Sequence, residues 1–170
     1  MPAEIAQIFL STARKSLLDE HWPRLSQCAC SLTEEQLWWR PNDSSNSIGN
    51  LLLHLNGNVG QWIVAAFNRK QDARDRPLEF STREGATAAE LLARLAATVE
   101  EAGATLARLS EADLLATYEI QGYTATGLYA IFHCIEHFAS HYGQIAYITK
   151  MLQNRDLGFF RDLNKTGRAK

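Results

Sequence analysis

The spacing of apolar residues constrains the fold of this chain more than any other feature of its sequence. Long segments carry apolar side chains at intervals of three and four residues, the pattern of an amphipathic helix rather than of a strand. Only four prolines occur in the 170 residues, so few positions interrupt this pattern. A chain of this length can bury about two thirds of its unfolded surface in one core. We therefore predict an all-α fold in a single domain that spans residues 1–170.

Proline and capping signals define the first part of this pattern. A first long helix is predicted over residues 3–30, with a kink at Pro23 because proline removes one backbone hydrogen bond. Thr33 and Gln36 have the spacing of a capping box and predict a short helical turn. This turn should end before Pro41.

The second and third helices are expected to be joined by a long connection. Helical spacing of apolar residues continues over residues 48–66, and either Ser47 or Asn46 can cap this helix. A charged stretch over residues 69–85 follows. Its length predicts a crossover rather than a tight hairpin.

Two more helices complete the predicted four-helix bundle. A third helix over residues 87–109 begins with a Thr–Glu capping box. After a short linker, Thr124 or Thr126 starts a fourth helix that continues to about Gln153.

Charge and composition argue against nucleic-acid binding and against a membrane span. Lys and Arg number 17 against 19 Asp and Glu, which gives a formal net charge of −2 and no basic stripe. The N-terminus lacks the regions of a signal peptide, and no run approaches about 18 apolar residues. The three cysteines, Cys28, Cys30 and Cys134, form no C-x-x-C pair. We expect a soluble protein of the reducing cytoplasm.

Three of the five histidines lie in one run near the end of the chain. His133, His137 and His141 are four residues apart, and side chains at this spacing share a helix face, with Cβ atoms about 5–6 Å apart. Two such imidazole rings can reach one metal ion, and imidazole is a common ligand of late transition metals. Helical phase places His137 and His141 on the apolar face with Phe138, and His133 near its edge. We therefore predict His137 and His141 as ligands.

A third ligand should come from a facing helix, and His54 is the candidate. It lies at the flank of the apolar stripe of the second helix, where Gly57 and Gly60 permit a close backbone approach. A ligand there would hold the metal near the mouth of the bundle, open to substrate. Asn50 and Asn58 lie four residues to either side, and they either orient the His54 ring or contribute polar surface.

These residues resemble a known family over nearly the whole chain. The matching segments are Leu51-Leu52-Leu53-His54-Leu55 followed by Trp62, and His137-Phe138-Ala139-Ser140-His141-Tyr142-Gly143-Gln144-Ile145. Both are similar to motifs of the DinB/YfiT-like metalloenzymes. The resemblance implies a four-helix bundle with a long crossover between helices two and three. It also implies one divalent metal ion, held by His54 from helix two and by the His137 and His141 pair from helix four.

The role of His133 stays open at this level. The sequence contains a weak internal repeat. When its two halves are aligned without gaps, His54 corresponds to Ile131, which is nearer in sequence to His133 than to His137. His133 is therefore a ligand, a hydrogen-bond partner of a ligand, or an ordinary and partly exposed residue. We prefer the later pair, His137 and His141, as ligands.

Three further side chains, Cys134, Glu136 and His21, are not predicted as metal ligands. Cys134 faces inward and is expected to pack as a small hydrophobic residue, although it could bind a soft metal. Glu136 could act as a general base beside the metal, but helical phase turns it away from the apolar face, so we expect it in solvent or at an interface. His21 has no partner at helical spacing and is expected at the surface or the edge of the core.

Three neutral imidazoles leave a fourth coordination position for water or substrate, as in catalytic zinc sites. Zinc suits these ligands best, with nickel, iron or manganese as alternatives. The expected function is that of a metal-dependent hydrolase or of an S-transferase that uses a low-molecular-weight thiol. Family members that use bacillithiol, mycothiol or glutathione support the second activity by analogy alone. No residue of the sequence identifies the substrate or a catalytic side chain other than the metal ligands.

The alternative is a protein without catalytic activity. In this hypothesis a stress-response dimer binds the ion only to tie helices two and four together. A homodimer is expected in either case, because the fourth helix has a second apolar face that includes Leu128 and Phe132.

Overall fold

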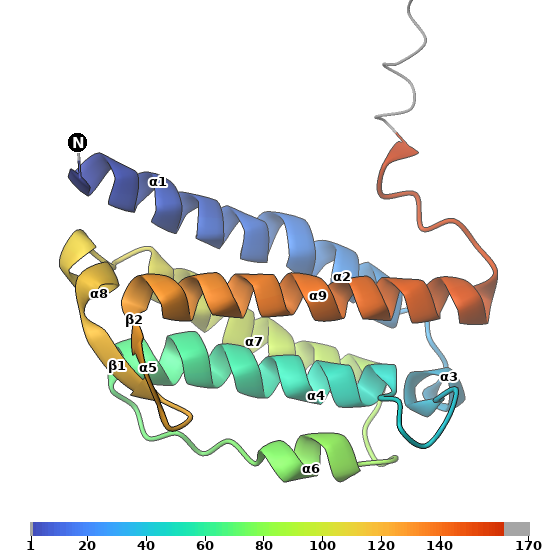
Figure 1. Ribbon diagram of the computed structural model, residues 1–170. Coiled ribbons are helices and arrows are strands. Elements are labelled where there is room, and N and C mark those ends of the chain that lie inside the picture. The colour runs from blue at the N-terminus through green and yellow to red at the C-terminus, as the bar shows by residue number, and fades with distance from the viewer. Residues whose placement is uncertain (1, 162–170) are drawn as a thin grey trace, which may run out of the picture.

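The computed structural model describes residues 2–161, and most of these residues are helical. The long helical segments are α1 (Pro2–Lys15), η1 (Ser16–His21) and α2 (Trp22–Ala29); α4 (Ile48–Val59), η2 (Gly60–Ala65) and α5 (Ala66–Asn68); α7 (Ala88–Leu106); and α9 (Gly127–Gln153). The short elements are α3 (Glu34–Trp38), α6 (Arg76–Ser81), α8 (Glu111–Leu115), β1 (Thr117–Ile120) and β2 (Tyr123–Thr126). Figure 1 shows α1, α4, α7 and α9 running along one another. The predicted helical character is thereby confirmed.

Local capping signals mark most helix starts correctly. The side chains of Thr33, Ser47 and Thr87 each accept a hydrogen bond from the backbone N–H three residues on. The side-chain oxygen of that later residue in turn accepts from the backbone N–H of the cap. Ser47 rather than Asn46 therefore begins α4. In the same way, the side chain of Thr126 rather than Thr124 accepts from the backbone of Tyr129 and begins α9.

The first helix passes through Pro23 without ending. The stretch directly before it, Ser16–His21, has π-helical geometry, and α2 then carries Pro23 in its first turn. Proline has no N–H to donate and its ring crowds the turn before it. A π-helical turn widens the helix at this point and accommodates the ring.

Four short elements were not predicted. α6 lies inside the charged connection, where the Asp75 side chain accepts from the N–H of Leu78 and caps it. The linker before α9 holds α8 and an antiparallel hairpin of β1 and β2, turned by Gln121 and Gly122, both with positive φ. The all-α prediction is corrected by this small sheet. Strands of four residues are too short for alternation to identify them.

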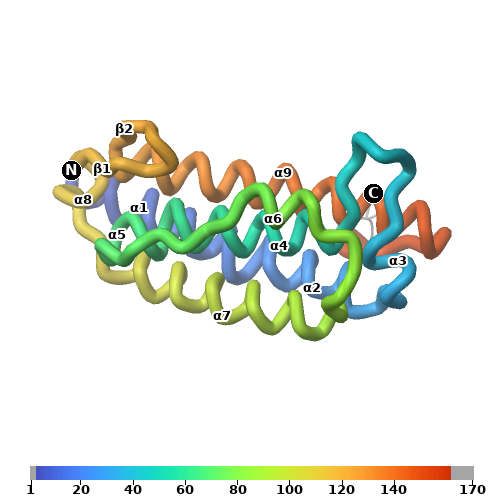
Figure 2. Tube along the Cα trace, turned by 90° about the horizontal axis from the view of Figure 1, so that it is seen from below, coloured from blue at the N-terminus to red at the C-terminus, as the bar shows by residue number. Residues whose placement is uncertain are grey.

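The connection between α5 and α7 is fastened to α4. Figure 2 shows α6 and the segments on either side of it running alongside α4. Asn50 is fully buried, and its Nδ2 donates to the backbone oxygens of Glu79 and Thr82 at 2.9 and 2.8 Å. Asn50 thus holds α6 in place, and it does not orient the His54 ring directly.

The core contains the apolar face of every long helix. Its largest fully buried side chains include Leu17, Leu25, Leu55, Ile63, Leu95, Leu106, Ile131 and Phe138. On α9, by contrast, Leu128 and Phe132 are 46% and 55% exposed, and the homodimer stays a prediction. No helix within residues 2–161 has the length and apolar character needed to cross a bilayer.

Candidate metal centre

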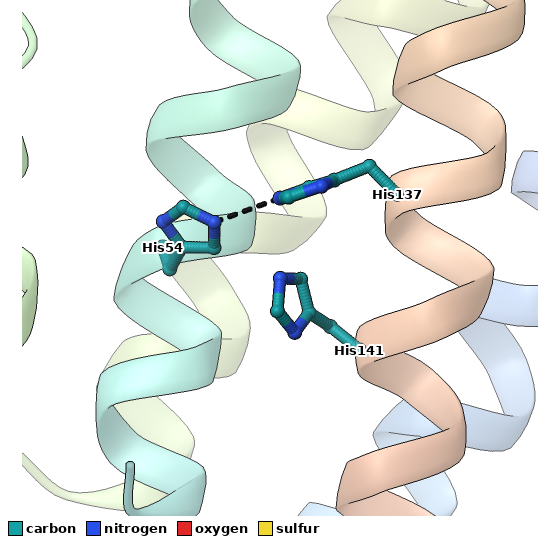
Figure 3. Close-up of side chains that lie close together, drawn as sticks. All are labelled: His54, His137 and His141. Atoms are coloured by element: carbon teal, nitrogen blue, oxygen red, sulfur yellow. Dashed lines mark hydrogen bonds between the residues drawn. The ribbon is translucent and has the colours of Figure 1, made fainter. Parts of the chain in front are cut away.

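Three histidine rings converge between α4 and α9. Figure 3 shows His54 pointing from α4 toward His137 and His141, which extend from neighbouring turns of α9. One ring nitrogen of each residue lies within 4.8 Å of the others, so the group could hold a metal ion. The closest pair is His54 Nε2 and His137 Nε2, at 2.7 Å. The structure therefore brings together the three residues that the sequence predicts as ligands.

A buried carboxylate orients the His54 ring. Glu79 Oε2 lies 2.9 Å from His54 Nδ1, and both side chains are almost fully buried. A carboxylate only accepts hydrogen bonds, so this contact requires a proton on Nδ1 and leaves the Nε2 lone pair for a metal. Arg74 Nη2 lies 3.1 Å from the same Nδ1, but it can only donate, so it makes no hydrogen bond to the ring in this tautomer. This arrangement is frequent among metal-binding histidines, because it fixes the tautomer and strengthens the ligand.

Arg74 in turn holds Glu79. Its Nε and Nη2 donate to the two carboxylate oxygens at 2.6 and 2.9 Å, and its Nη1 donates to Gln61 Oε1 at 2.8 Å. Burial alone would raise the pKa of Glu79, but the hydrogen bonds from Arg74 and His54 outweigh it and lower that pKa. Glu79 is therefore a carboxylate at neutral pH.

His141 has its own orienting partner on α9. Gln144 Oε1 lies 3.0 Å from His141 Nδ1, one helical turn away. A proton on Nδ1 makes this hydrogen bond and leaves Nε2 as the free ligand atom. Two of the three rings thus have a group that sets the tautomer suited to a metal.

The histidines of α9 are held neutral. Burial, together with the neighbouring rings of His141, His54 and His133, lowers the pKa of His137 to about 3. Burial also lowers the pKa of His141, although the hydrogen bond with Gln144 opposes this. Neutral imidazole is the form that binds metals.

The donor set fits a divalent transition metal. Nitrogen ligands around zinc lie about 2.0–2.1 Å from the ion, so neighbouring nitrogens in a tetrahedral site are about 3.4 Å apart. One pair of ring nitrogens, at 2.7 Å, is closer than this, and all three nitrogens lie within 4.8 Å of one another, so binding a common ion would require the rings to adjust. Imidazole suits zinc, copper, iron and nickel, and the geometry does not select among them.

Comparison with known proteins identifies the family of this chain. A sequence profile described as the DinB superfamily matches residues 17–145, which include all three histidines. The chain belongs to the DinB superfamily. A search of curated proteins finds no significant match.

Solved structures support the DinB fold. A conserved protein from Enterococcus faecalis superposes with a TM-score of 0.72 at 17% identity, covering 85% of this chain and 97% of that one. A DinB-like protein from Bacillus cereus gives a TM-score of 0.63 at 13% identity, covering 78% and 86% of the two chains. At such low identities the likeness concerns the fold alone.

The remaining sequence candidates lie outside the three-histidine group of this DinB chain. His133 packs between Trp62 and Tyr129, with ring centroids 4.3 and 6.0 Å away. Cys134 is fully buried, and burial raises the pKa of its thiol to about 12, so it remains a neutral core side chain. Glu136 is exposed, and His21 is half-buried at the edge of the core.

Glu79 and Arg74 are the functional residues that sequence reasoning missed. Both come from the charged connection over residues 69–85, where many charged side chains have no periodic pattern. The only hint was Gly57, one turn after His54. A Cβ at Gly57 would lie 2.0 Å from Glu79 Oε1 and 2.7 Å from Arg74 Nε. Glycine is required here because the ion pair approaches the α4 backbone so closely.

A cavity adjoins the DinB histidines. It has a volume of about 770 Å³ and lies between α4, η2, α9, the connection and the hairpin. His54 and His137 form part of its wall, and His133 lies further along it. Small molecules that enter this cavity therefore meet two of the three candidate ligands.

Proposed function

We propose that this DinB protein is a metal-dependent enzyme, either a hydrolase or an S-transferase that uses a low-molecular-weight thiol. One observation carries the proposal. Three imidazoles come together, and two of them, His54 and His137, form part of the wall of a cavity large enough for a small molecule. Within residues 2–161 no fourth His, Cys, Asp or Glu joins the group. Three protein ligands next to an open space are typical of catalytic sites, whereas structural sites are closed by a fourth ligand.

The histidines, Glu79 and Arg74 have different roles in the proposed site. His54, His137 and His141 would hold a divalent ion, with zinc as the best match to the ligands. When bound, such an ion would lower the pKa of a coordinated water or thiol and supply a nucleophile near neutral pH. Glu79 fixes the tautomer of His54, and Arg74 keeps Glu79 ionised.

The framework of the site supports the same proposal. Four long helical segments and the long connection over residues 69–87 are consistent with a DinB-type four-helix bundle that has a crossover between helices two and three. That crossover has a chemical role in the proposal, because it brings Glu79 to the outer side of His54.

Metal analysis followed by activity assays tests the proposal. Protein purified without a polyhistidine tag should contain about one divalent ion per chain. His54→Ala and His137→Ala should each lose most of the metal, and with it the hydrolysis of activated esters or the transfer of small thiols to electrophiles. Stoichiometric metal in both variants would exclude the site. Metal loss without any change in activity would favour the non-catalytic alternative.

A further inference from the structure

The cavity beside the histidines is lined by positively charged side chains and by no negatively charged ones. None of its lining residues is an aspartate or glutamate, while two arginines contribute to its wall. The charge of Arg74 is neutralised by Glu79. Arg76 is exposed and forms no ion pair with any described residue. The cavity therefore has one positive side chain without an ionic partner, Arg76, and a divalent ion bound at the histidines would add further positive charge.

Arg76 is held near the proposed metal ligands by an aromatic contact. Its guanidinium carbon lies 5.0 Å from the centroid of the Phe80 ring, within the range of a cation–π interaction. The Phe80 ring is in turn 4.8 Å from the His54 ring. Residues of the same connection thus supply the orienting carboxylate of His54 and a free cation at the cavity.

Aromatic side chains line the region farther from the metal ligands. The His133 ring stacks on Tyr129 with an inclination of 10°, and its other neighbour, Trp62, is tilted against it by 50°.

We propose that the cavity binds a small organic anion as substrate. Its oxyanion group, a carboxylate or a similar planar or tetrahedral group, pairs with Arg76. Its apolar or planar part packs on the wall of Trp62, His133 and Tyr129, and its reactive group lies at the three histidines. This inference rests on the proposed function and adds the charge of the substrate to it.

Matched thiols on the cobalt-loaded protein test this proposal. A thiolate bound to Co²⁺ gives a charge-transfer absorption band in the near ultraviolet, which reports binding without any turnover. The probes are mercaptoacetate, 3-mercaptopropionate and 4-mercaptobutyrate, each beside its neutral amide. We expect at least one carboxylate to bind about threefold or more tightly than its amide, with the difference shrinking at high salt. 3-Mercaptopropanesulfonate shows whether a sulfonate serves as well as a carboxylate.

Two arginine variants assign the effect to a residue. Arg76→Gln should lower the affinity for the carboxylate to that for the amide and leave the amide affinity unchanged. Arg94→Gln removes the same charge from the exposed face of α7, away from this cavity, and should change neither affinity. Unchanged amide binding also shows that Arg76→Gln is folded.

The outcomes separate this inference from the proposed function. Equal affinities for acid and amide in the wild type, or an acid preference that survives Arg76→Gln, would overturn the anion site while the open metal site stands. Cobalt binding with no thiolate band for any probe would reject the open site, and the anion proposal with it. No cobalt binding at all would reject the three-histidine site itself.

Discussion

His54 and Glu79 form a deeply buried polar pair at the edge of the proposed centre. Their side chains are 5% and 8% exposed, and Nδ1 and Oε2 are 2.9 Å apart. The two residues come from different parts of the chain, α4 and α6, and Glu79 is the group that orients the His54 ring at Nδ1. Metal affinity should therefore depend on a residue that never touches the metal.

Glu79→Gln tests this dependence with little change in shape. The amide can still accept from His54 Nδ1, but it provides no negative charge to strengthen the ligand. We expect a loss of metal affinity of about tenfold or more, measured by competition with a chromophoric chelator. Glu84→Gln, an exposed residue of the same connection, is the control and should keep wild-type affinity. Equal affinities in all three proteins would mean that Glu79 has only a structural role.

Gly57→Ala should disturb the hydrogen bond between His54 and Glu79 through a new contact from the α4 backbone. Its new Cβ would lie 2.0 Å from Glu79 Oε1, so the carboxylate must move away from His54. We expect weaker metal binding, comparable in size to that of Glu79→Gln. Gly60→Ala is the matched control on the next turn, because its Cβ would meet only Thr98 Cγ2, at 3.8 Å. If both alanine variants bind metal like the wild type, the approach at Gly57 has no bearing on the site.

Arg74→Met should destabilise the metal-free protein by leaving Glu79 buried without its cation. Removing one partner of a buried ion pair costs about 3 kcal/mol, whereas an exposed substitution such as Arg94→Met costs within about 0.5 kcal/mol. Denaturant unfolding at neutral pH measures both. Adding Glu79→Gln to Arg74→Met should recover part of the loss, because no charge is then left unpaired.

The Arg74–Glu79 pair also predicts how the free-energy cost of Arg74→Met changes with pH. The pKa of Glu79 is lowered in the folded protein, so the pair stabilises the fold above the ordinary glutamate pKa of 4.5 and loses this contribution as the pH falls through the lowered pKa. The difference in unfolding free energy between wild type and Arg74→Met should therefore shrink in acid. A difference that stays constant from neutral pH to pH about 3 would contradict this assignment.

His21 predicts a second pH effect, away from the metal ligands. Its ring stacks on Phe138 and Tyr142, its Nδ1 is buried without a partner among the described residues, and burial lowers its pKa. The fold thus favours neutral His21, and this contribution is lost as the pH falls below the ordinary histidine pKa of 6.5, where the unfolded chain takes up the proton.

His21→Phe should remove this part of the pH dependence. Between about pH 7.5 and 5, metal-free wild type should lose more unfolding free energy than His21→Phe. The other histidines with lowered pKa contribute equally to both proteins, so the difference reports His21 alone. A parallel decline in the two proteins would show that His21 accepts its proton freely in the fold.

Helix starts and the candidate ligands were accessible from the sequence because they depend on neighbours in the chain. A cap such as Ser47 or Thr87 bonds to a backbone group three residues away, and His137 and His141 share a face through the pitch of one helix. The choice of His137 over His133 also follows from helical phase. The β1–β2 hairpin and α6 were missed, since each is too short for a periodic pattern.

What the sequence determined by itself was therefore local: the helices, their caps, and one pair of histidines on a common face. Only the tertiary structure decided which groups surround that pair. Glu79 and Arg74 reach His54 because α6 packs along α4, and no short-range pattern in a charged connection encodes that contact. Hydrogen bonds and charges act over a few ångströms in space, so residues that are distant in the chain become chemical partners only after packing brings them together.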